Sequence, residues 1–172
     1  MFIGIEMDEE TKEKLVVLQE KLLRSGFNGM PVPKENLHLT LAFIGEYPDA
    51  EKVLDVLEEV AFTPFDLEGI GNFGDLFWAG VSQNDTLLQL SGRIRRALAD
   101  QDIPFDRKSF HPHVTLLRKV SLAEGYFMPE EETIHMHADH VTLFHSRQGK
   151  HGMIYTEIGS IISDKGEIEC VL

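Results

Sequence analysis

The sequence predicts an α+β fold with antiparallel strands, in which two related halves face each other across a central cleft. Extended apolar segments alternate with amphipathic helical ones, and the last strands are joined by short loops. When the sequence is shifted against itself so that Leu39 falls on Val114, the elements of one half also fall on those of the other. From this self-alignment we expect a bilobal fold of two antiparallel sheets flanked by helices, related by a pseudo-two-fold axis.

The first half predicts a strand, a helix, a loop and a second strand. The segment Phe2–Met7 is apolar and rich in residues that favour strands, and Asp8 then caps a helix whose leucines recur at helical spacing. A loop over residues 26–33 ends this helix. In the strand over residues 36–45, four apolar residues alternate with three residues of the opposite face; the apolar set is Leu37, Leu39, Leu41 and Phe43, and the other set is His38, Thr40 and Ala42.

Further elements precede the second half, which begins at Phe77 and repeats this order. Asp49 opens a helix that carries Val53, Leu57 and Val60, and residues 65–82 predict two strands joined by a glycine-rich turn. Asp85 caps a further helix with an apolar stripe at Leu87, Leu90, Ile94 and Leu98. The strand FHPHVTLLRK over residues 110–119 follows, and residues 132–146 and 152–163 predict two long extended segments.

Composition predicts one soluble domain over residues 1–172. Hydrophobic residues make up 42% of the chain and no apolar run approaches the ~20 residues of a membrane span, so we expect a cytoplasmic monomer without membrane contact. The single cysteine excludes an intrachain disulfide and a zinc site with several thiolates. A net charge of −13 argues against a protein that coats long nucleic acid, although residues 93–119 hold seven basic and three acidic residues.

Two copies of a His-x-Thr pattern are the strongest functional signal. In the self-alignment, His38 falls on His113 and Thr40 falls on Thr115. Residues i and i+2 of a strand point to the same side, so each strand presents one imidazole beside one hydroxyl. Two opposed imidazoles suit in-line displacement at phosphorus, because one can take a proton from the incoming oxygen while the other gives a proton to the departing oxygen. The hydroxyls can bind phosphate oxygens, and the reaction requires neither a metal nor another cofactor.

The segments HLTLAFIG and FHPHVTLLRK closely resemble the two signature motifs of the two-histidine phosphoesterase superfamily, in its LigT-like branch. This branch comprises the RNA 2′,3′-cyclic phosphodiesterases, also called 2′-5′ RNA ligases. The resemblance covers nearly the whole chain and implies a bilobal fold. It also implies metal-independent hydrolysis of a 2′,3′-cyclic phosphate to a 2′-phosphomonoester, with RNA ends or small cyclic nucleotides as substrates.

The resemblance implies a role for each residue that matches a motif. His38 matches the proton donor to the leaving oxygen and His113 matches the base that activates water. Thr40 and Thr115 match the phosphate-binding hydroxyls, and Arg118 matches an arginine that contacts phosphate. The pseudo-symmetry makes the two histidine roles geometrically interchangeable. His111 falls on Asn36 in the self-alignment, so we interpret it as a rim residue that tunes the pKa of His113 through like charge.

Several alternatives stay open at the level of sequence. The cluster His135, His137, Asp139 and His140 could bind a metal, with His111 as a further candidate ligand. The aromatic residues Trp78, Phe43, Phe73, Phe110 and Tyr155 are candidates to stack on a nucleobase, although each is also a candidate for the core. The protein could also act as a 2′-5′ RNA ligase, as a phosphodiesterase on another nucleotide such as ADP-ribose cyclic phosphate, or as an RNA-end-binding module without catalysis.

Overall fold

The computed structural model describes residues 1–57, 65–136, 140–150, 152–162 and 168–170. The first half contains β1 (Phe2–Glu6), α1 (Glu9–Arg24), β2 (Phe27–Pro31), the 3₁₀ turn η1 (Lys34–Asn36) and β3 (His38–Phe43). The rest contains α2 (Ala50–Leu54), β4 (Phe65–Phe73), β5 (Leu76–Val81), α3 (Asp85–Asp100), β6 (His113–Leu122), β7 (Ile134–Met136), β8 (His140–Gly149), β9 (Gly152–Ile162) and β10 (Ile168–Cys170). The α+β class with antiparallel strands is confirmed.

The described strands form one sheet, where the sequence predicts two. Its order is β10-β9-β8-β1-β3-β6-β5-β4-β7, every pair is antiparallel, and β2 also pairs with β6. The two halves join where Leu39 of β3 pairs with Val114 of β6. Strand alternation within each half cannot predict this contact, because it links two strands that are distant in the chain.

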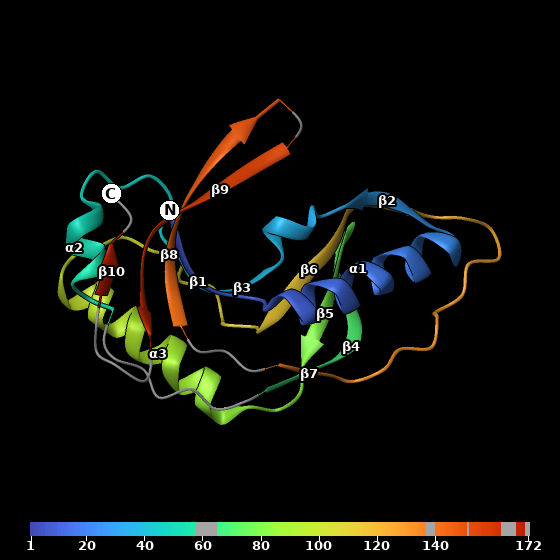
Figure 1. Cartoon of the computed structure of the whole chain (residues 1–172), viewed down its shortest axis with the longest axis horizontal. Helices are drawn as coiled ribbons and strands as arrows, with labels where there is room; N and C mark the ends of the chain where they lie inside the picture. Colours follow the sequence, from blue (N-terminus) through green and yellow to red (C-terminus); the bar gives the residue numbers. More distant parts are fainter. Residues whose placement is uncertain (58–64, 137–139, 151, 163–167, 171–172) are drawn as a thin grey trace.

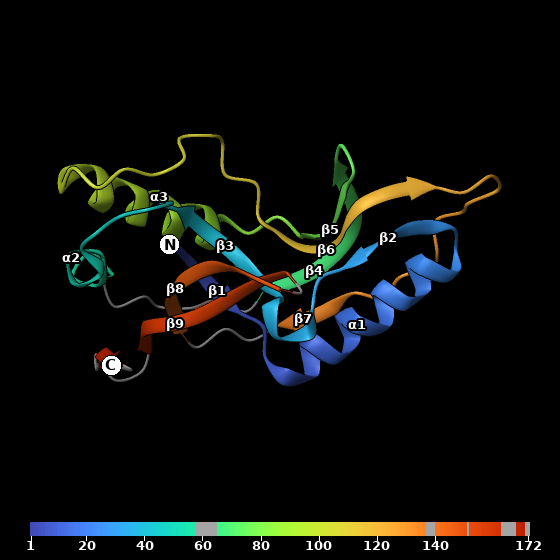
Figure 2. The same ribbon diagram turned by 90° about the horizontal axis from the view of Figure 1, so that it is seen from above.

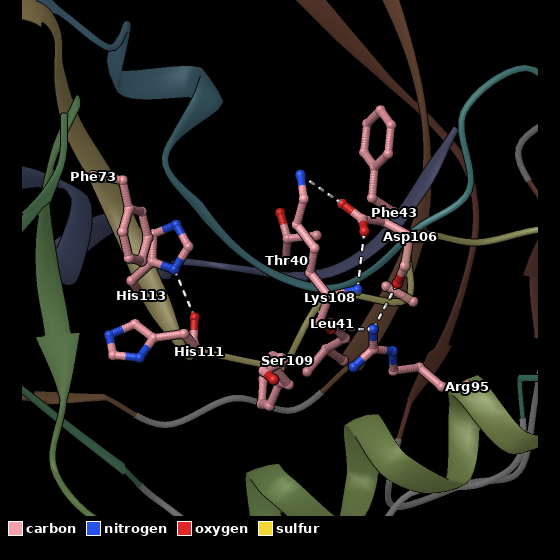
Figure 3. Close-up of a pocket in the computed structure, with 12 residues that line it drawn as sticks. Thr40, Leu41, Phe43, Phe73, Arg95, Asp106, Lys108, Ser109, His111 and His113 are labelled. Carbon is pink, nitrogen blue, oxygen red and sulfur yellow. Dashed lines mark hydrogen bonds and ion pairs between the residues drawn. The ribbon is translucent and has the colours of Figure 1, made fainter. Parts of the chain in front are cut away.

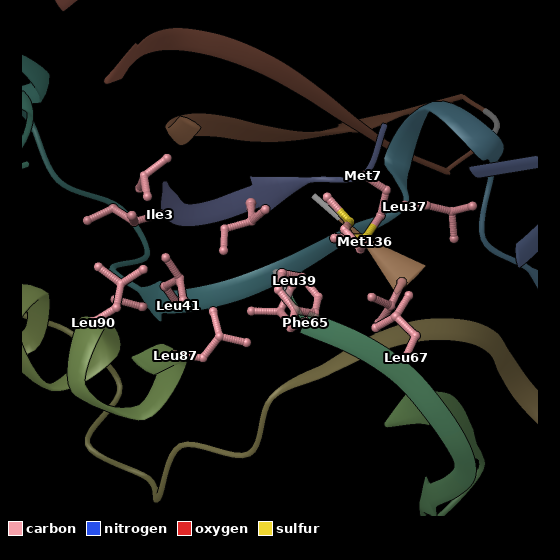
Figure 4. Close-up of a cluster of buried hydrophobic side chains, with 14 of the residues drawn as sticks. Ile3, Met7, Leu37, Leu39, Leu41, Phe65, Leu67, Leu87, Leu90 and Met136 are labelled. Carbon is pink, nitrogen blue, oxygen red and sulfur yellow. The ribbon is translucent and has the colours of Figure 1, made fainter. Parts of the chain in front are cut away.

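The two long helices lie at opposite ends of the molecule, with β1, β3 and β6 between them (Figure 1 and Figure 2). Helix α3 packs against β3 of the first half. Helix α1 packs against β2 of its own half and against β6 and β7 of the other half. The apolar stripes predicted for both helices are buried: Leu15, Leu18 and Leu22 in α1, and Leu87, Leu90, Ile94 and Leu98 in α3. Leu87 and Leu90 pack in one core with Leu39 and Leu41 of β3 (Figure 4).

Each α-helix begins directly after a residue whose side chain caps its first turn. The Asp8 carboxylate accepts a hydrogen bond from the Thr11 N–H at 2.7 Å, and Asp49 accepts one from the Lys52 N–H at 2.9 Å, as predicted for N-caps. The prediction for α3 is wrong by one residue, because the Asn84 side chain accepts from the Leu87 N–H at 3.0 Å and is the cap. No helix among the described residues is long and apolar enough to cross a bilayer.

Three other predicted boundaries differ from the structure. The predicted loop over residues 26–33 contains β2, whose pairing with β6 is a tertiary contact. Helix α2 ends at Leu54; Leu57 is buried beyond its end, and Val60 lies outside the described residues. The predicted extended segment over residues 132–146 contains two strands, β7 and β8, which lie at distant places in the sheet.

Candidate active site

The site forms where β3 and β6 meet. Leu39 and Val114 pair across the two strands and both point into the core with no exposed surface. In an antiparallel register, this pair places His38 beside Thr115 and Thr40 beside His113. Because alternate residues of a strand share a face, these four side chains lie together on the face opposite to Leu39 and Val114. The structure therefore brings both predicted histidines and both predicted threonines onto one surface.

A β-bulge turns Arg118 onto the same face. Thr115 pairs with Trp78 and Leu117 pairs with Phe77, so β5 offers no partner to Leu116. Leu116 and Leu117 are consequently both buried, and the next residue, Arg118, is exposed. Without the extra residue, strict alternation would put Arg118 on the core face. The bulge explains how an arginine that follows His113 at this spacing can share a surface with it.

The first half contains the equivalent bulge. Thr40 pairs with Gly4 and Ala42 pairs with Ile3, so Leu41 has no partner in β1. Leu41 and Ala42 are both buried, and Phe43 is 51% exposed. The prediction that Phe43 shares the apolar face of Leu41, with Ala42 opposite, is wrong because it assumed unbroken alternation. In the self-alignment, Phe43 occupies the position of Arg118.

His38 is held from both ends of its ring. Its Nδ1 lies 2.7 Å from the Asn36 carbonyl oxygen, and since a carbonyl can only accept, Nδ1 carries a hydrogen. Its Nε2 lies 3.0 Å from the Thr40 hydroxyl. The ring stacks on Phe2 at 4.5 Å and meets the edge of Tyr155 at 5.1 Å between centroids. These contacts fix the tautomer and aim Nε2 toward the threonine.

The surroundings of His38 favour its neutral form. Burial lowers the pKa of His38 to about 4, and the positive charges of Arg118 and His113 act in the same direction, while the Asn36 carbonyl and the Glu6 carboxylate oppose the shift. His38 is therefore neutral near pH 7 in the absence of a ligand.

His113 has a matching arrangement. Its Nδ1 lies 2.6 Å from the His111 carbonyl oxygen, which again places the hydrogen on Nδ1 and leaves Nε2 as a proton acceptor. The rings of Phe73 and Trp78 lie 5.3 Å and 5.8 Å from the His113 ring. Burial lowers the pKa of His113, and the like charges of His111 and Arg118 contribute in the same direction. His113 is thus a base in its ligand-free state.

A pocket of about 680 Å³ opens beside His113 (Figure 3). Its lining includes Thr40, His111, Phe43, Phe73 and Phe110, together with the cations of Arg95 and Lys108. Arg95 donates to the carbonyl oxygens of Asp106 and Lys108, and so holds this wall in place. His38 lines a second hollow of about 180 Å³. The larger pocket has room for a nucleotide, and its lining includes Thr40 and His113 of the two motifs.

Four of the five predicted aromatic residues line one of these two hollows. Phe43, Phe73 and Phe110 line the larger pocket and Tyr155 lines the smaller one. Trp78 packs against His111 at 4.9 Å and Phe73 at 5.3 Å between centroids. Phe73 is 48% exposed, which leaves an aromatic surface free for contact.

The alternative metal cluster is not assembled by the residues that can be placed. His135 Nδ1 lies 2.6 Å from the Asp66 carboxylate, and His140 is in β8, away from β7 in the sheet. His137 and Asp139 lie outside the described residues. Within the described ranges, no group of three or more histidine, cysteine, aspartate or glutamate side chains is arranged to hold a metal ion.

Comparison with known proteins places the chain in a family. The sequence profile described as "2′-5′ RNA ligase superfamily" matches residues 19–150, most of the chain. The chain belongs to the 2′-5′ RNA ligase superfamily. An RNA 2′,3′-cyclic phosphodiesterase of Thermotoga maritima is 35% identical over 130 residues, which cover 68% of each protein. A protein of the same name from Escherichia coli is 33% identical over 131 residues, which cover 72% of this chain and 73% of that one.

Solved structures agree with this membership of the 2′-5′ RNA ligase superfamily. The crystal structure of E. coli LigT complexed with 3′-AMP is 27% identical in sequence, has a TM-score of 0.78, and matches 95% of this chain and 97% of its own. LigT complexed with ATP has a TM-score of 0.74 and 28% identity, and covers 94% of this chain and 95% of its own. The likeness therefore extends over both halves of the chain.

The structure adds residues to the site that sequence reasoning did not identify. Phe2 and Phe144 pack around the His38 ring, at 4.5 Å and 6.3 Å. The carbonyls of Asn36 and His111 each orient the histidine two residues later. The self-alignment pairs Asn36 with His111 and could have indicated a shared backbone role, whereas no sequence signal marks Phe2 or Phe144 as neighbours of His38.

Proposed function

We propose that this protein hydrolyses RNA 2′,3′-cyclic phosphate ends to 2′-phosphomonoesters without a metal ion, using His38 and His113 as an acid–base pair. The observation that carries the proposal is the antiparallel pair Leu39–Val114, because it sets two imidazoles and two threonine hydroxyls on one face. These paired residues are equivalent in the self-alignment, as expected if a two-fold axis relates two lobes and runs between them. Membership of a family with cyclic phosphodiesterase relatives supports the same reaction.

In the proposed reaction, a water oxygen attacks phosphorus while the bond from phosphorus to the 3′ oxygen breaks. Nε2 of His113 takes the water proton, and Nε2 of His38 gives a proton to the departing 3′ oxygen. The product keeps its phosphate on the 2′ oxygen, and the two histidines exchange their protonation states. Thr40, Thr115 and Arg118 bind the non-bridging phosphate oxygens, where negative charge grows in the transition state.

The proposed roles need a neutral His113 and a protonated His38, and we expect bound substrate to bring about the second of these. Both pKa values lie below the usual value for histidine, which suits His113 as a base. His38 must gain a proton before it can act as the acid. A bound cyclic phosphate is an anion, and an anion beside His38 favours the imidazolium form. We therefore expect substrate binding itself to raise the pKa of His38 and to prepare the acid.

The larger pocket is the proposed site of the terminal nucleoside. Phe43 and Phe73 are exposed aromatic residues within it, and either ring could stack on a base. E. coli LigT has been crystallised with 3′-AMP, and this complex supports a nucleotide as the ligand of the present protein. RNA ends and small cyclic nucleotides both carry a base that one of these rings could stack on, so both are proposed substrates.

Product analysis tests the proposed reaction. Adenosine 2′,3′-cyclic phosphate should give only adenosine 2′-phosphate by phosphorus NMR, and the rate should persist after exhaustive chelation with EDTA. A 3′-phosphate product, or loss of activity that returns with added metal, would contradict the proposal. Complete absence of turnover with tight binding of the same ligand would favour an RNA-end-binding module.

The same site supports 2′-5′ ligation as a second candidate. The pocket beside His113 has room for more than a cyclic phosphate, so a nucleoside with a free 5′-hydroxyl could replace the attacking water. His113 would take the hydroxyl proton and the phosphate would remain bonded to the 2′ oxygen. Incubation of an RNA cyclic phosphate with a 5′-hydroxyl RNA should then give a product that resists a 3′-5′-specific nuclease.

A further inference from the structure

Each of the two β-bulges contains one residue whose backbone carbonyl accepts a hydrogen bond from a helix side chain. Leu116 has no partner in β5, and Leu41 has none in β1. A buried carbonyl oxygen needs a hydrogen-bond donor, and at both bulges a side chain provides one. The donors found here are two polar side chains that are almost completely buried and that come from helices.

Gln19 of α1 supplies the donor at the second bulge. Its side-chain amide donates to the Leu116 carbonyl oxygen at 2.8 Å and to the Val32 carbonyl oxygen at 2.9 Å, and Gln19 is 3% exposed. The Val32 N–H donates to the same Leu116 oxygen at 2.9 Å. The two donors occupy both lone pairs of this carbonyl oxygen, so its hydrogen-bonding capacity is filled.

Ser91 of α3 supplies the donor at the first bulge. Its hydroxyl donates to the Leu41 carbonyl oxygen at 2.9 Å, and its exposed fraction is 0%. Leu41 falls on Leu116 in the self-alignment, so the two bonds reach equivalent carbonyls. Each bond also comes from the helix of the opposite half, since α3 packs against β3 and α1 packs against β6.

We propose that Gln19 and Ser91 are positioning residues of the active site, which act through the bulges rather than by touching the substrate. Gln19 holds the bulge that turns Arg118 toward the phosphate, and Ser91 holds the bulge that turns Phe43 into the pocket. If a bulge relaxed to a regular ladder, the residues after it would exchange faces, and Arg118 or Phe43 would point toward the core. This inference rests on the proposed function only for its activity readout.

A double-mutant cycle distinguishes an effect of Gln19 on the position of Arg118 from a general effect on the stability of the fold. Gln19→Met keeps the size of the side chain and removes the amide. In the wild-type background it should lower kcat/KM for a 2′,3′-cyclic phosphate by about five- to thirtyfold, because the lost hydrogen bond to the bulge no longer favours the productive placement of Arg118. In the Arg118→Ala background it should change kcat/KM by less than about twofold, because the group it positions is gone.

Ser91→Ala is the matched control. It removes the equivalent bond on the other side, so its effect should persist in the Arg118→Ala background and disappear in the Phe43→Ala background. Equal effects of Gln19→Met with and without Arg118 would overturn the proposal.

A crystal structure of Gln19→Met supplies a readout that does not depend on activity. Leu116 should pair with β5, or Arg118 should leave the face of His113. An unchanged bulge with Arg118 in place would overturn the proposal even if the proposed function held, whereas an inactive wild-type enzyme with an altered bulge in Gln19→Met would contradict the function alone.

Discussion

At the scale of single residues, the protonation of two imidazoles decides what the site can do. His38 and His113 each donate from Nδ1 to a backbone carbonyl, and burial lowers both pKa values. A free site with two neutral imidazoles can accept a proton at either Nε2. The direction of the reaction then depends on a difference between the two halves. The clearest difference is that Arg118 occupies in one half the position that Phe43 occupies in the other.

Acid should destabilise the protein partly through His38. Between pH 6.5 and about 4 the unfolded chain binds a proton at His38 that the folded chain does not, so stability rises with pH across this window. The shift corresponds to at most about 3 kcal/mol of the free energy of unfolding. We expect His38→Asn to lose less stability than the wild type between pH 7 and pH 4.5 in urea titrations.

His113 also makes the folded protein more stable as the pH rises from acid, because its pKa is lowered like that of His38. A residual slope should therefore remain in His38→Asn, and should decrease again in the double variant with His113→Asn. Identical losses in the wild type and in His38→Asn would show that burial does not perturb His38.

Substitution of Gly71 should displace the tryptophan beside the site. Gly71 pairs with Trp78, and a Cβ at position 71 would overlap the Trp78 ring. Gly71→Ala should destabilise the protein by about 1–3 kcal/mol through overpacking, and should change the fluorescence of Trp78, the single tryptophan. Gly92→Ala in α3 is the control: a Cβ there meets nothing within 4 Å, and it should stabilise the helix by about 0.5–1 kcal/mol.

At the scale of elements, local sequence signals predict the helices better than the strand pairing. The caps at Asp8 and Asn84 lie where short polar residues precede apolar stripes, and both stripes are buried as predicted. Strand alternation fails at Ala42 and Phe43 because the bulge depends on the partner strand β1. The sequence predicts a loop where β2 lies for a related reason, because this short segment adopts a strand conformation only through its pairing with β6.

The candidate site was more accessible from sequence than the fold details. His38, Thr40, His113 and Thr115 carry a repeated pattern, and a period of 2 within a strand is enough to put each pair on one face. Their convergence on a single surface required the pairing of Leu39 with Val114. The bulges, the carbonyls that orient the histidines and the buried donors Gln19 and Ser91 are tertiary features, which no local pattern encodes.

At the scale of the whole molecule, the continuous sheet predicts cooperative unfolding. Both halves contribute strands to one sheet, and each long helix packs against strands of the other half. We expect urea to unfold the chain in one transition, with coincident midpoints for the fluorescence of Trp78, which reports on β5, and for far-UV circular dichroism, which reports on all elements. Separate midpoints would indicate two lobes that unfold independently.

The central claim is that His38 and His113 act as one acid–base pair, and single-turnover hydrolysis of a 2′,3′-cyclic phosphate by His38→Ala, His113→Ala and the double variant tests it most directly. Each single variant should lose about 10²–10⁴ in rate, the usual contribution of a positioned acid or base. The double variant should be little slower than the worse single variant, because residues that act as a unit are not additive. A single variant that retains a rate within tenfold of the wild type would contradict the account.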